Sequence, residues 1–237
     1  SPKGFADIGM LFLLSTGEEK DLEPVRQWAR SIADRPHKYA WHLGYGGIPL
    51  CEYYLRTGDQ EVLPGIQKWV NNAVKAQYLD GWAGRGGVPS VTYGNGHLNA
   101  AGTHVVTFLM LAKECGAEVP DRLLLRSLRH FYRYAGRGNN PYGDNRPEVG
   151  FVDNGKNGKL AIAMAAAAAL TPDGENSLYA KARDVCAIQS FYTTSFMLHG
   201  HTGGGIGEIW RSAAMGLMSE KKPRQYREFM DKIGRAS

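Results

Sequence analysis

The hydrophobic positions along most of the chain recur with the period of an α-helix. In residues 21–33, for example, Leu22, Val25, Ala29 and Ile32 form an apolar stripe, and the charged side chains face away from it. No segment shows the strict alternation of a β-strand, so we expect an all-α protein. The pattern predicts about ten helices, over residues 5–15, 21–33, 46–57, 60–76, 97–115, 120–134, 157–170, 176–197, 205–219 and 223–233.

The predicted helices fall into pairs that resemble one another. The first helix of a pair is apolar or small on nearly every side, and the second has one apolar face and one charged face. Each first helix is followed by a glycine, at Gly17, Gly58, Gly116 and Gly174, and the last two intervals are equal. Glycine suits the left-handed position that ends a helix. A recurring helix pair of this kind indicates a helical repeat, with the buried helices in an inner ring and their partners outside.

Segments rich in glycine and aromatic residues precede the inner helices. They are residues 41–49, 80–102, 142–160 and 199–210. All four enter their helices at the same end, so two concentric rings would bring them to one face of the molecule. Because loops on a rigid scaffold commonly carry function, we expect the functional site at this loop-rich face.

The composition is that of a soluble globular chain able to bury a large core, with 43% hydrophobic and 22% charged residues among 237. The net charge of +5 is mild and its basic residues are scattered, so no nucleic-acid partner is expected. The longest apolar run, residues 160–170, is too short to span a bilayer. Cys51, Cys115 and Cys186 lie far apart in apolar contexts, which predicts buried free thiols.

Three segments carry a resemblance to a known family: YGNGHLNAAG (93–102), FVDNGKNGKLAIAMAAAA (151–168) and HGHTGGGIGEIWR (199–211). They resemble an uncharacterised bacterial family of α/α-toroid domains, a shape similar to that of terpenoid cyclases and six-hairpin glycosidases. The resemblance covers nearly the whole chain. It implies a single α/α-toroid domain over residues 1–237, either a toroid or an open ring of about five helical hairpins. It further implies a fragment of a longer multi-domain protein that is periplasmic or secreted.

Acidic residues gather before the alanine-rich helix that begins near residue 157. Asp144, Glu148 and Asp153 lie there among several cations and amides. Glycoside hydrolysis needs two carboxyl groups, one as acid and one as base or nucleophile, and neighbouring cations keep one of them ionised. Asp153, at the mouth of an inner helix, is our first candidate for such a group, with Glu148 beside it. The alternative is a loop held together by its own ion pairs.

The segment HGHTGGGIGEIWR allows three interpretations. His199, His201 and Glu208 can bind a metal ion, although the HExxH pattern of zinc proteases is absent and no metal is otherwise expected. His201 and Glu208 can instead transfer protons, because an imidazole titrates near neutral pH. In the third interpretation the glycines allow close helix packing and Glu208 pairs with Arg211.

The remaining candidates are substrate-binding residues. Aromatic faces stack on sugar rings, and the polar edges of the same residues bind hydroxyl groups. The residues of this kind are Trp41, His42, Tyr45, Trp82, Tyr93, His97 and Tyr142. Arg85 and Lys156 are expected to contact an acidic sugar. Because His97 and His104 are seven positions apart, we expect both imidazoles on one helix face, in the cavity beside His201 or as core residues.

Taken together, these features predict a carbohydrate-active enzyme resembling a glycoside hydrolase, which acts on a polysaccharide or oligosaccharide without a cofactor. Asp153 or Glu148 would act with Glu208. In a polysaccharide lyase, the first alternative, His201 or Tyr142 would be the base. The second is a non-catalytic scaffold that binds glycans or peptides. The third, an isoprenoid cyclase or transferase, would need a deep apolar pocket, and the acidic motifs of such enzymes are absent.

Overall fold

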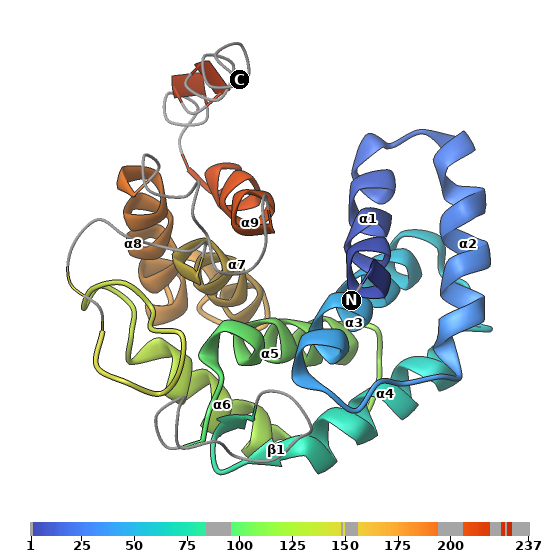
Figure 1. Ribbon diagram of the computed structural model, residues 1–237, viewed down its shortest axis with the longest axis horizontal. Coiled ribbons are helices and arrows are strands. Elements are labelled where there is room, and N and C mark those ends of the chain that lie inside the picture. The colour runs from blue at the N-terminus through green and yellow to red at the C-terminus, as the bar shows by residue number, and fades with distance from the viewer. Residues whose placement is uncertain are drawn as a thin grey trace. The chain divides into compact units, whose positions relative to one another are not determined.

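A computed structural model describes residues 2–83, 96–147, 149, 156–193, 206–218, 224–225 and 227–228. These residues are mostly helical, which confirms the expectation of an all-α protein (Figure 1). None of the helices among them is long and apolar enough to cross a membrane. They form two compact units, residues 1–130 with 142–145 and residues 131–141 with 146–237, and each unit is considered by itself.

The first unit is built around two central helices, α3 (Ala40–Thr57) and α5 (Asn99–Glu114), which pack against each other. Nearly every residue of α5 is buried, as the sequence predicts for an inner helix. Around this pair lie α1 (Pro2–Thr16), α2 (Glu19–Ala33), α4 (Leu63–Ala76) and most of α6 (Asp121–Tyr132) (Figure 1).

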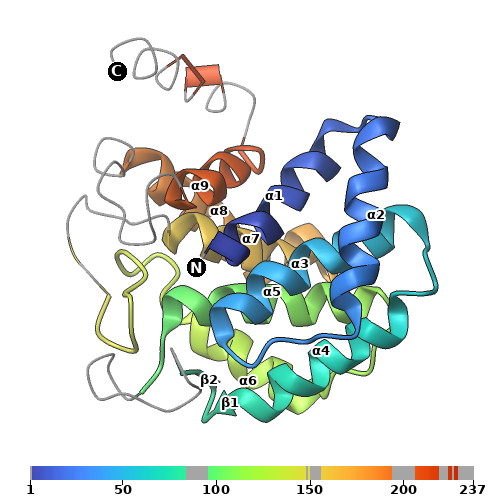
Figure 2. The ribbon, with the colours of Figure 1, turned by 45° about the vertical axis from the view of Figure 1, so that its right-hand side comes forward.

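The first unit also contains a two-stranded antiparallel sheet that the sequence analysis did not predict. Its strands are β1 (Gln77–Tyr78) and β2 (Gly81–Trp82), and they lie beside α6 (Figure 2). Strands of two residues are too short to show an alternating pattern in the sequence. The hairpin matters because its turn contributes to the site described below.

The second unit is built around α7 (Lys156–Ala169), which packs against α8 (Leu178–Tyr192) and α9 (Ile206–Met215). A short 3-10 helix, η3 (Gly174–Asn176), precedes α8. The contact between α7 and α9 requires a glycine, because a Cβ atom on Gly158 would lie 2.8 Å from the carbonyl oxygen of Trp210. Near the start of α7 the side chain of Asn157 binds Asn139 and the backbone of Asn140.

The glycines that follow the inner helices have the left-handed backbone that the sequence predicts. The φ angles are +76° at Gly17, +67° at Gly58, +89° at Gly116 and +47° at Gly174. At the end of α3, the amide of Gly58 donates to the carbonyl oxygen of Tyr54. These glycines come after α1, α3, α5 and α7 in the chain, so the left-handed backbone predicted at them is confirmed at all four positions.

The glycine-rich segment 41–49 is not the predicted loop but the first half of α3. Its glycines allow α3 to approach other helices. A Cβ atom on Gly44 would lie 2.2 Å from the Cβ of His104, and one on Gly47 would lie 2.5 Å from the ring of Phe108. Tertiary packing therefore outweighs the low helix propensity of glycine here.

The three cysteines are buried free thiols, as predicted. The Sγ atom of Cys115 lies 3.7 Å from the carbonyl oxygen of Cys51, within the contact between α3 and α5. Burial raises the pKa of the Cys51 thiol well above its ordinary value, and Cys115 adds to this effect. A raised thiol pKa lowers the fraction of thiolate, so Cys51 is a packing residue rather than a nucleophile.

Asp59 joins three segments of the first unit and should make the stability of the fold depend on pH. It accepts hydrogen bonds from Arg30 Nε (3.0 Å), the Tyr53 hydroxyl (2.7 Å) and the Glu61 amide (3.2 Å). Burial raises the pKa of this carboxyl group, but the hydrogen bonds outweigh burial and hold it below the usual 3.8. The resulting stabilisation is present above pH 3.8 and is lost as the pH falls through the folded-state pKa.

We therefore expect Asp59→Asn to destabilise the protein more at pH 7 than at a pH below the folded-state pKa of Asp59. Urea unfolding of both proteins at the two pH values measures this difference. An equal loss at both values would show that the ionised form of Asp59 does not stabilise the fold.

Candidate functional site

Two histidines and two aspartates of the first unit meet at the N-terminal end of α5. We call Asp80, His97, His130 and Asp144 the imidazole–carboxylate centre. One oxygen of Asp80 lies 3.7 Å from Nδ1 of His97 and 3.4 Å from Nδ1 of His130. An oxygen of Asp144 lies 3.6 Å from Nδ1 of His97. The two imidazole rings stand nearly perpendicular, with their centroids 5.1 Å apart.

Asp80 reaches the centre because the β1–β2 hairpin is held against α6. Arg126 of α6 donates to the carbonyl oxygen of Leu79, and Gln77 donates to the hydroxyl of Ser127. Leu79 has a positive φ of 53°, which makes the turn tight. Gly81 then leaves room for the ring of His97, since a Cβ atom there would lie only 3.3 Å from it.

Asp144 reaches the centre because residues 142–145 are bound to the start of α5. The amide of Ala100 donates a hydrogen bond to the carbonyl oxygen of Tyr142 at 3.1 Å. The side-chain amide of Asn99 donates to the carbonyl oxygen of Gly143 at 2.8 Å. The first contact satisfies one of the backbone N–H groups that a helix leaves unpaired at its N-terminus.

Hydrogen bonds on the far side of each ring determine which nitrogen faces the aspartates. Nε2 of His97 lies 2.8 Å from the carbonyl oxygen of Tyr78, which can only accept, so this nitrogen carries the hydrogen. Nε2 of His130 lies 2.8 Å from Oδ1 of Asn99, whose amide nitrogen is already used on Gly143. Both Nδ1 atoms therefore face the carboxylates and present a lone pair when the rings are neutral.

The centre combines buried histidines with carboxylates that water can reach to different degrees. His97 and His130 are 1% and 2% exposed. The side chains of Asp80 and Asp144 are 39% and 10% exposed. This arrangement can transfer protons between a carboxyl group and a ligand, and it can hold a cation between the two Nδ1 atoms and the carboxylates.

Aromatic residues lie next to the centre and form what we call the aromatic cluster, Trp41, Tyr45, His104 and Tyr142. The ring of Tyr45 lies 5.5 Å from that of Trp41 and 4.7 Å from that of His104, measured between centroids. Burial, and then the neighbouring Tyr142, raise the pKa of Tyr45. Tyr142 is two residues from Asp144 in the sequence, so one short segment contributes to both the aromatic cluster and the centre. Trp41 and Tyr142 are half-buried, and so retain accessible surface.

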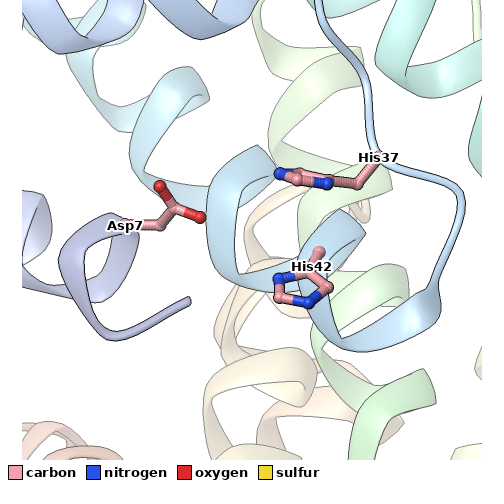
Figure 3. A group of neighbouring side chains, drawn as sticks. All are labelled: Asp7, His37 and His42. Atoms are coloured by element: carbon pink, nitrogen blue, oxygen red, sulfur yellow. The ribbon is translucent and has the colours of Figure 1, made fainter. Parts of the chain in front are cut away.

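A second group of titratable side chains, Asp7, His37 and His42, lies between the start of α3 and α1 (Figure 3). Asp7 accepts a hydrogen bond from the indole of Trp28 at 3.0 Å. The two imidazoles are tilted by 31° with centroids 4.8 Å apart. Burial, followed by repulsion from His37, lowers the pKa of His42, so its ring tends to be neutral. We call these three residues the His37–His42 group.

The structure places five predicted substrate-binding residues in or near these clusters. They are His97 in the centre, Trp41, Tyr45 and Tyr142 in the aromatic cluster, and His42 in the His37–His42 group. Two others lie differently from the expectation. Trp82 is buried and its indole donates to the carbonyl oxygen of Ala73, so it is a core residue rather than a stacking surface. Lys156 is buried in the first turn of α7, in the second unit.

The expectation that His97 and His104 share one helix face is wrong. Helix α5 begins at Asn99, so His97 precedes it and the helical period does not apply between the two positions. His97 belongs to the imidazole–carboxylate centre, whereas His104 packs in the aromatic cluster.

Several predicted site residues lie outside the described part of the chain. They are Arg85, Tyr93, Glu148, Asp153, His199 and His201. The backbone of Glu208 belongs to α9, but its side chain is also outside this part. The roles assigned to these residues remain predictions.

The sequence analysis missed Asp80 and His130 altogether, and it gave Asp144 no role of its own. His130 lies in an amphipathic helix that reads as a solvent-facing partner helix, and Asp80 lies in a hairpin turn. The available signal was a histidine within the predicted amphipathic helix, and in the structure this histidine is buried. No regular spacing links these residues, because they meet only through tertiary contacts.

Comparison with known proteins identifies a family to which the chain belongs. Residues 1–236 match the family described as Domain of unknown function (DUF6288). No curated protein and no solved structure matches the chain. The match covers nearly the whole chain and establishes that it belongs to this family.

Proposed function

We propose that this chain, a member of the DUF6288 family, is a carbohydrate-active hydrolase with an α/α-toroid-type fold. The proposal rests on the geometry of its side chains. Its active centre in this proposal is the imidazole–carboxylate centre. One observation carries the proposal: Asp80 and Asp144 approach the same nitrogen of His97, beside half-buried aromatic side chains.

The two carboxyl groups are the chemical requirement for glycoside hydrolysis. One must donate a proton to the leaving oxygen, and the other must act as base or nucleophile. Asp80 and Asp144 lie 3.7 Å and 3.6 Å from the same Nδ1 of His97, so the two carboxyl groups lie close together. They also differ in exposure, because the side chain of Asp80 is 39% exposed and that of Asp144 only 10%. We propose Asp144, the more buried, as acid and Asp80 as base.

The aromatic cluster supports a sugar substrate. The accessible faces of Trp41 and Tyr142 can stack on sugar rings, while the tyrosine hydroxyl binds a sugar hydroxyl. A polysaccharide or oligosaccharide bound there would extend past Asp144, two residues from Tyr142. A periplasmic or secreted location, inferred from the sequence resemblance, would give the protein access to such a polymer and completes the proposal.

A screen of neutral and acidic polysaccharides tests the proposed reaction. The purified chain is incubated with each polymer, and new reducing ends and the absorbance of unsaturated uronates are measured. We expect reducing ends from at least one polymer, without unsaturated products. Unsaturated uronates would identify a lyase instead, and no product from any polymer would favour a binding scaffold. Either result would overturn the proposal.

Replacement of Trp41 by alanine is expected to weaken binding of the cleaved polymer. Loss of one stacking face should raise KM about tenfold, with kcat nearly unchanged, because the ring does not take part in proton transfer. Steady-state kinetics on short oligosaccharides measure both constants. Tyr192→Ala, at an exposed aromatic residue of the second unit, is the control and should leave both constants unchanged. An unaltered KM in Trp41→Ala would place the substrate away from the aromatic cluster.

A further inference from the structure

We infer that the imidazole–carboxylate centre binds one divalent transition-metal ion, with zinc as the best fit. The ligands are Nδ1 of His97, Nδ1 of His130 and a carboxylate oxygen of Asp80, and Asp144 holds a water molecule in the fourth position. In the metal-bound centre Asp80 therefore acts on that water through the ion and not as a free base. The inference concerns the centre of the proposed function, but it does not depend on the identity of the substrate.

The separations between the ligand atoms suit a shared ion. Zinc ligands lie about 2.1 Å from the metal, so two ligand atoms of a tetrahedral site are about 3.4 Å apart. An oxygen of Asp80 lies 3.4 Å from Nδ1 of His130 and 3.7 Å from Nδ1 of His97, and an oxygen of Asp144 lies 3.6 Å from Nδ1 of His97. The ligand atoms of Asp80, His97 and His130 all lie within 4.8 Å of one another. Direct N–H···O hydrogen bonds are shorter, at about 2.7–3.2 Å. The side chains are therefore spaced to surround a small ion.

The hydrogen bonds behind the rings orient both histidines as metal ligands. Metal-binding histidines commonly donate their second N–H group to a carbonyl or carboxylate, which fixes the tautomer and the plane of the ring. His97 does so to the carbonyl oxygen of Tyr78, and His130 does so to the side-chain oxygen of Asn99. Both bonds are 2.8 Å long, and both leave Nδ1 as the ligand atom. Asn99 is thus a positioning residue for the site.

The ligand chemistry points to zinc rather than to calcium or magnesium. Imidazole nitrogens suit zinc and its transition-metal neighbours, whereas calcium and magnesium take oxygen ligands. Two neutral imidazoles with two carboxylates balance the charge of a divalent ion. The histidines are buried, but Asp80 is 39% exposed, which leaves a path for the ion and for a water ligand. Such a water is what a catalytic zinc site activates.

The His37–His42 group provides an internal comparison, because its three ligand atoms also lie within 4.8 Å of one another. Its chemistry is less suited to a metal. Asp7 already accepts from the indole of Trp28, and the two rings are partly stacked instead of converging. We therefore expect zinc at His97 and His130 and not in this group.

Metal content measured on tag-free, full-length chain tests the inference. The protein is stripped with a chelator, incubated with zinc, separated from free metal by gel filtration and analysed by mass spectrometry. We expect about one zinc ion per chain, lost in His97→Gln and His130→Gln and retained in the matched variants His37→Gln and His42→Gln. Circular dichroism shows whether each variant is folded.

If a variant of a buried histidine fails to fold, Asp80→Asn tests zinc binding in its place. Asp80 is partly exposed, so this variant should fold and bind zinc about tenfold or more weakly than the wild type. A wild-type chain that retains no zinc would overturn the inference, as would zinc that is lost only from the His37–His42 variants. A chain that binds zinc but cleaves no polysaccharide would overturn the proposed function alone. A chain that retains no zinc after incubation with the metal but still cleaves a polysaccharide would overturn this inference alone.

Discussion

Replacement of Gly44 by alanine is expected to lower the free energy of unfolding by about 3 kcal/mol, the upper end of the usual cost of overpacking. Gly44 lies in α3 against α5. A Cβ atom there would come to 2.2 Å from the Cβ of His104 and 3.0 Å from its carbonyl carbon. Because these atoms belong to the backbone of α5 or are attached to it, a rotamer change cannot relieve the clash and the helices must move apart.

Gly9→Ala is the matched control for Gly44→Ala. Gly9 also lies inside a helix, but nothing lies within 4 Å of a Cβ atom built on it. Alanine there should raise the free energy of unfolding by about 0.5–1 kcal/mol, because it restricts the unfolded chain and favours the helix. Urea denaturation of both variants measures the change in the free energy of unfolding, which should be negative for Gly44→Ala and positive for Gly9→Ala. Similar stabilities would contradict the close packing of α3 on α5.

Asn99→Leu is expected to lower the free energy of unfolding by about 2–6 kcal/mol and to weaken zinc binding at the centre as well. Asn99 is 1% exposed and binds both Nε2 of His130 and the carbonyl oxygen of Gly143. Leucine is similar in size but leaves a buried donor and a buried acceptor without partners, at about 1–3 kcal/mol for each group. Loss of the orienting bond to His130 should also lower zinc affinity about 10–100-fold.

Gln67→Leu is the control for Asn99→Leu, because Gln67 also donates one hydrogen bond and accepts another, but does so on the protein surface. Gln67 accepts from the amide of Glu118 and donates to its carbonyl oxygen, and these bonds are exposed. Water can replace them, so we expect a loss of less than about 1 kcal/mol. Urea unfolding compares the two variants. Equal losses would show that Asn99 is not the buried link between α5, His130 and residues 142–145.

The helices could be predicted from the sequence because periodicity and turn residues agree along most of the chain. Gly58 and Gly116, for example, end their helices with the expected left-handed backbone. The start of α3 could not be predicted in the same way. Its glycines are typical of a loop, and only their contacts with α5 and α4 explain why the helix begins at Ala40. Local propensity is a weak guide where tertiary packing decides.

The candidate site was predictable only in part. His97 and Tyr142 stood out as polar and aromatic residues beside inner helices, and both lie where the centre and the aromatic cluster meet. Asp80 could not be found, because its partnership with His130 depends on the contact of the hairpin with Arg126. A two-residue strand and a single side-chain contact between distant segments leave no periodic signal in the sequence.

The most direct test of the account is the turnover of a susceptible polysaccharide by Asp80→Asn. Asparagine keeps the shape of the side chain but removes its charge and its capacity to accept a proton. If Asp80 acts in the active centre, kcat should fall about 100-fold or more, as is usual when an acid–base group is lost. Asp34→Asn, at an exposed carboxylate paired with Lys68, should retain wild-type turnover. Wild-type turnover in a folded Asp80→Asn variant would contradict the assignment of the imidazole–carboxylate centre as the active site.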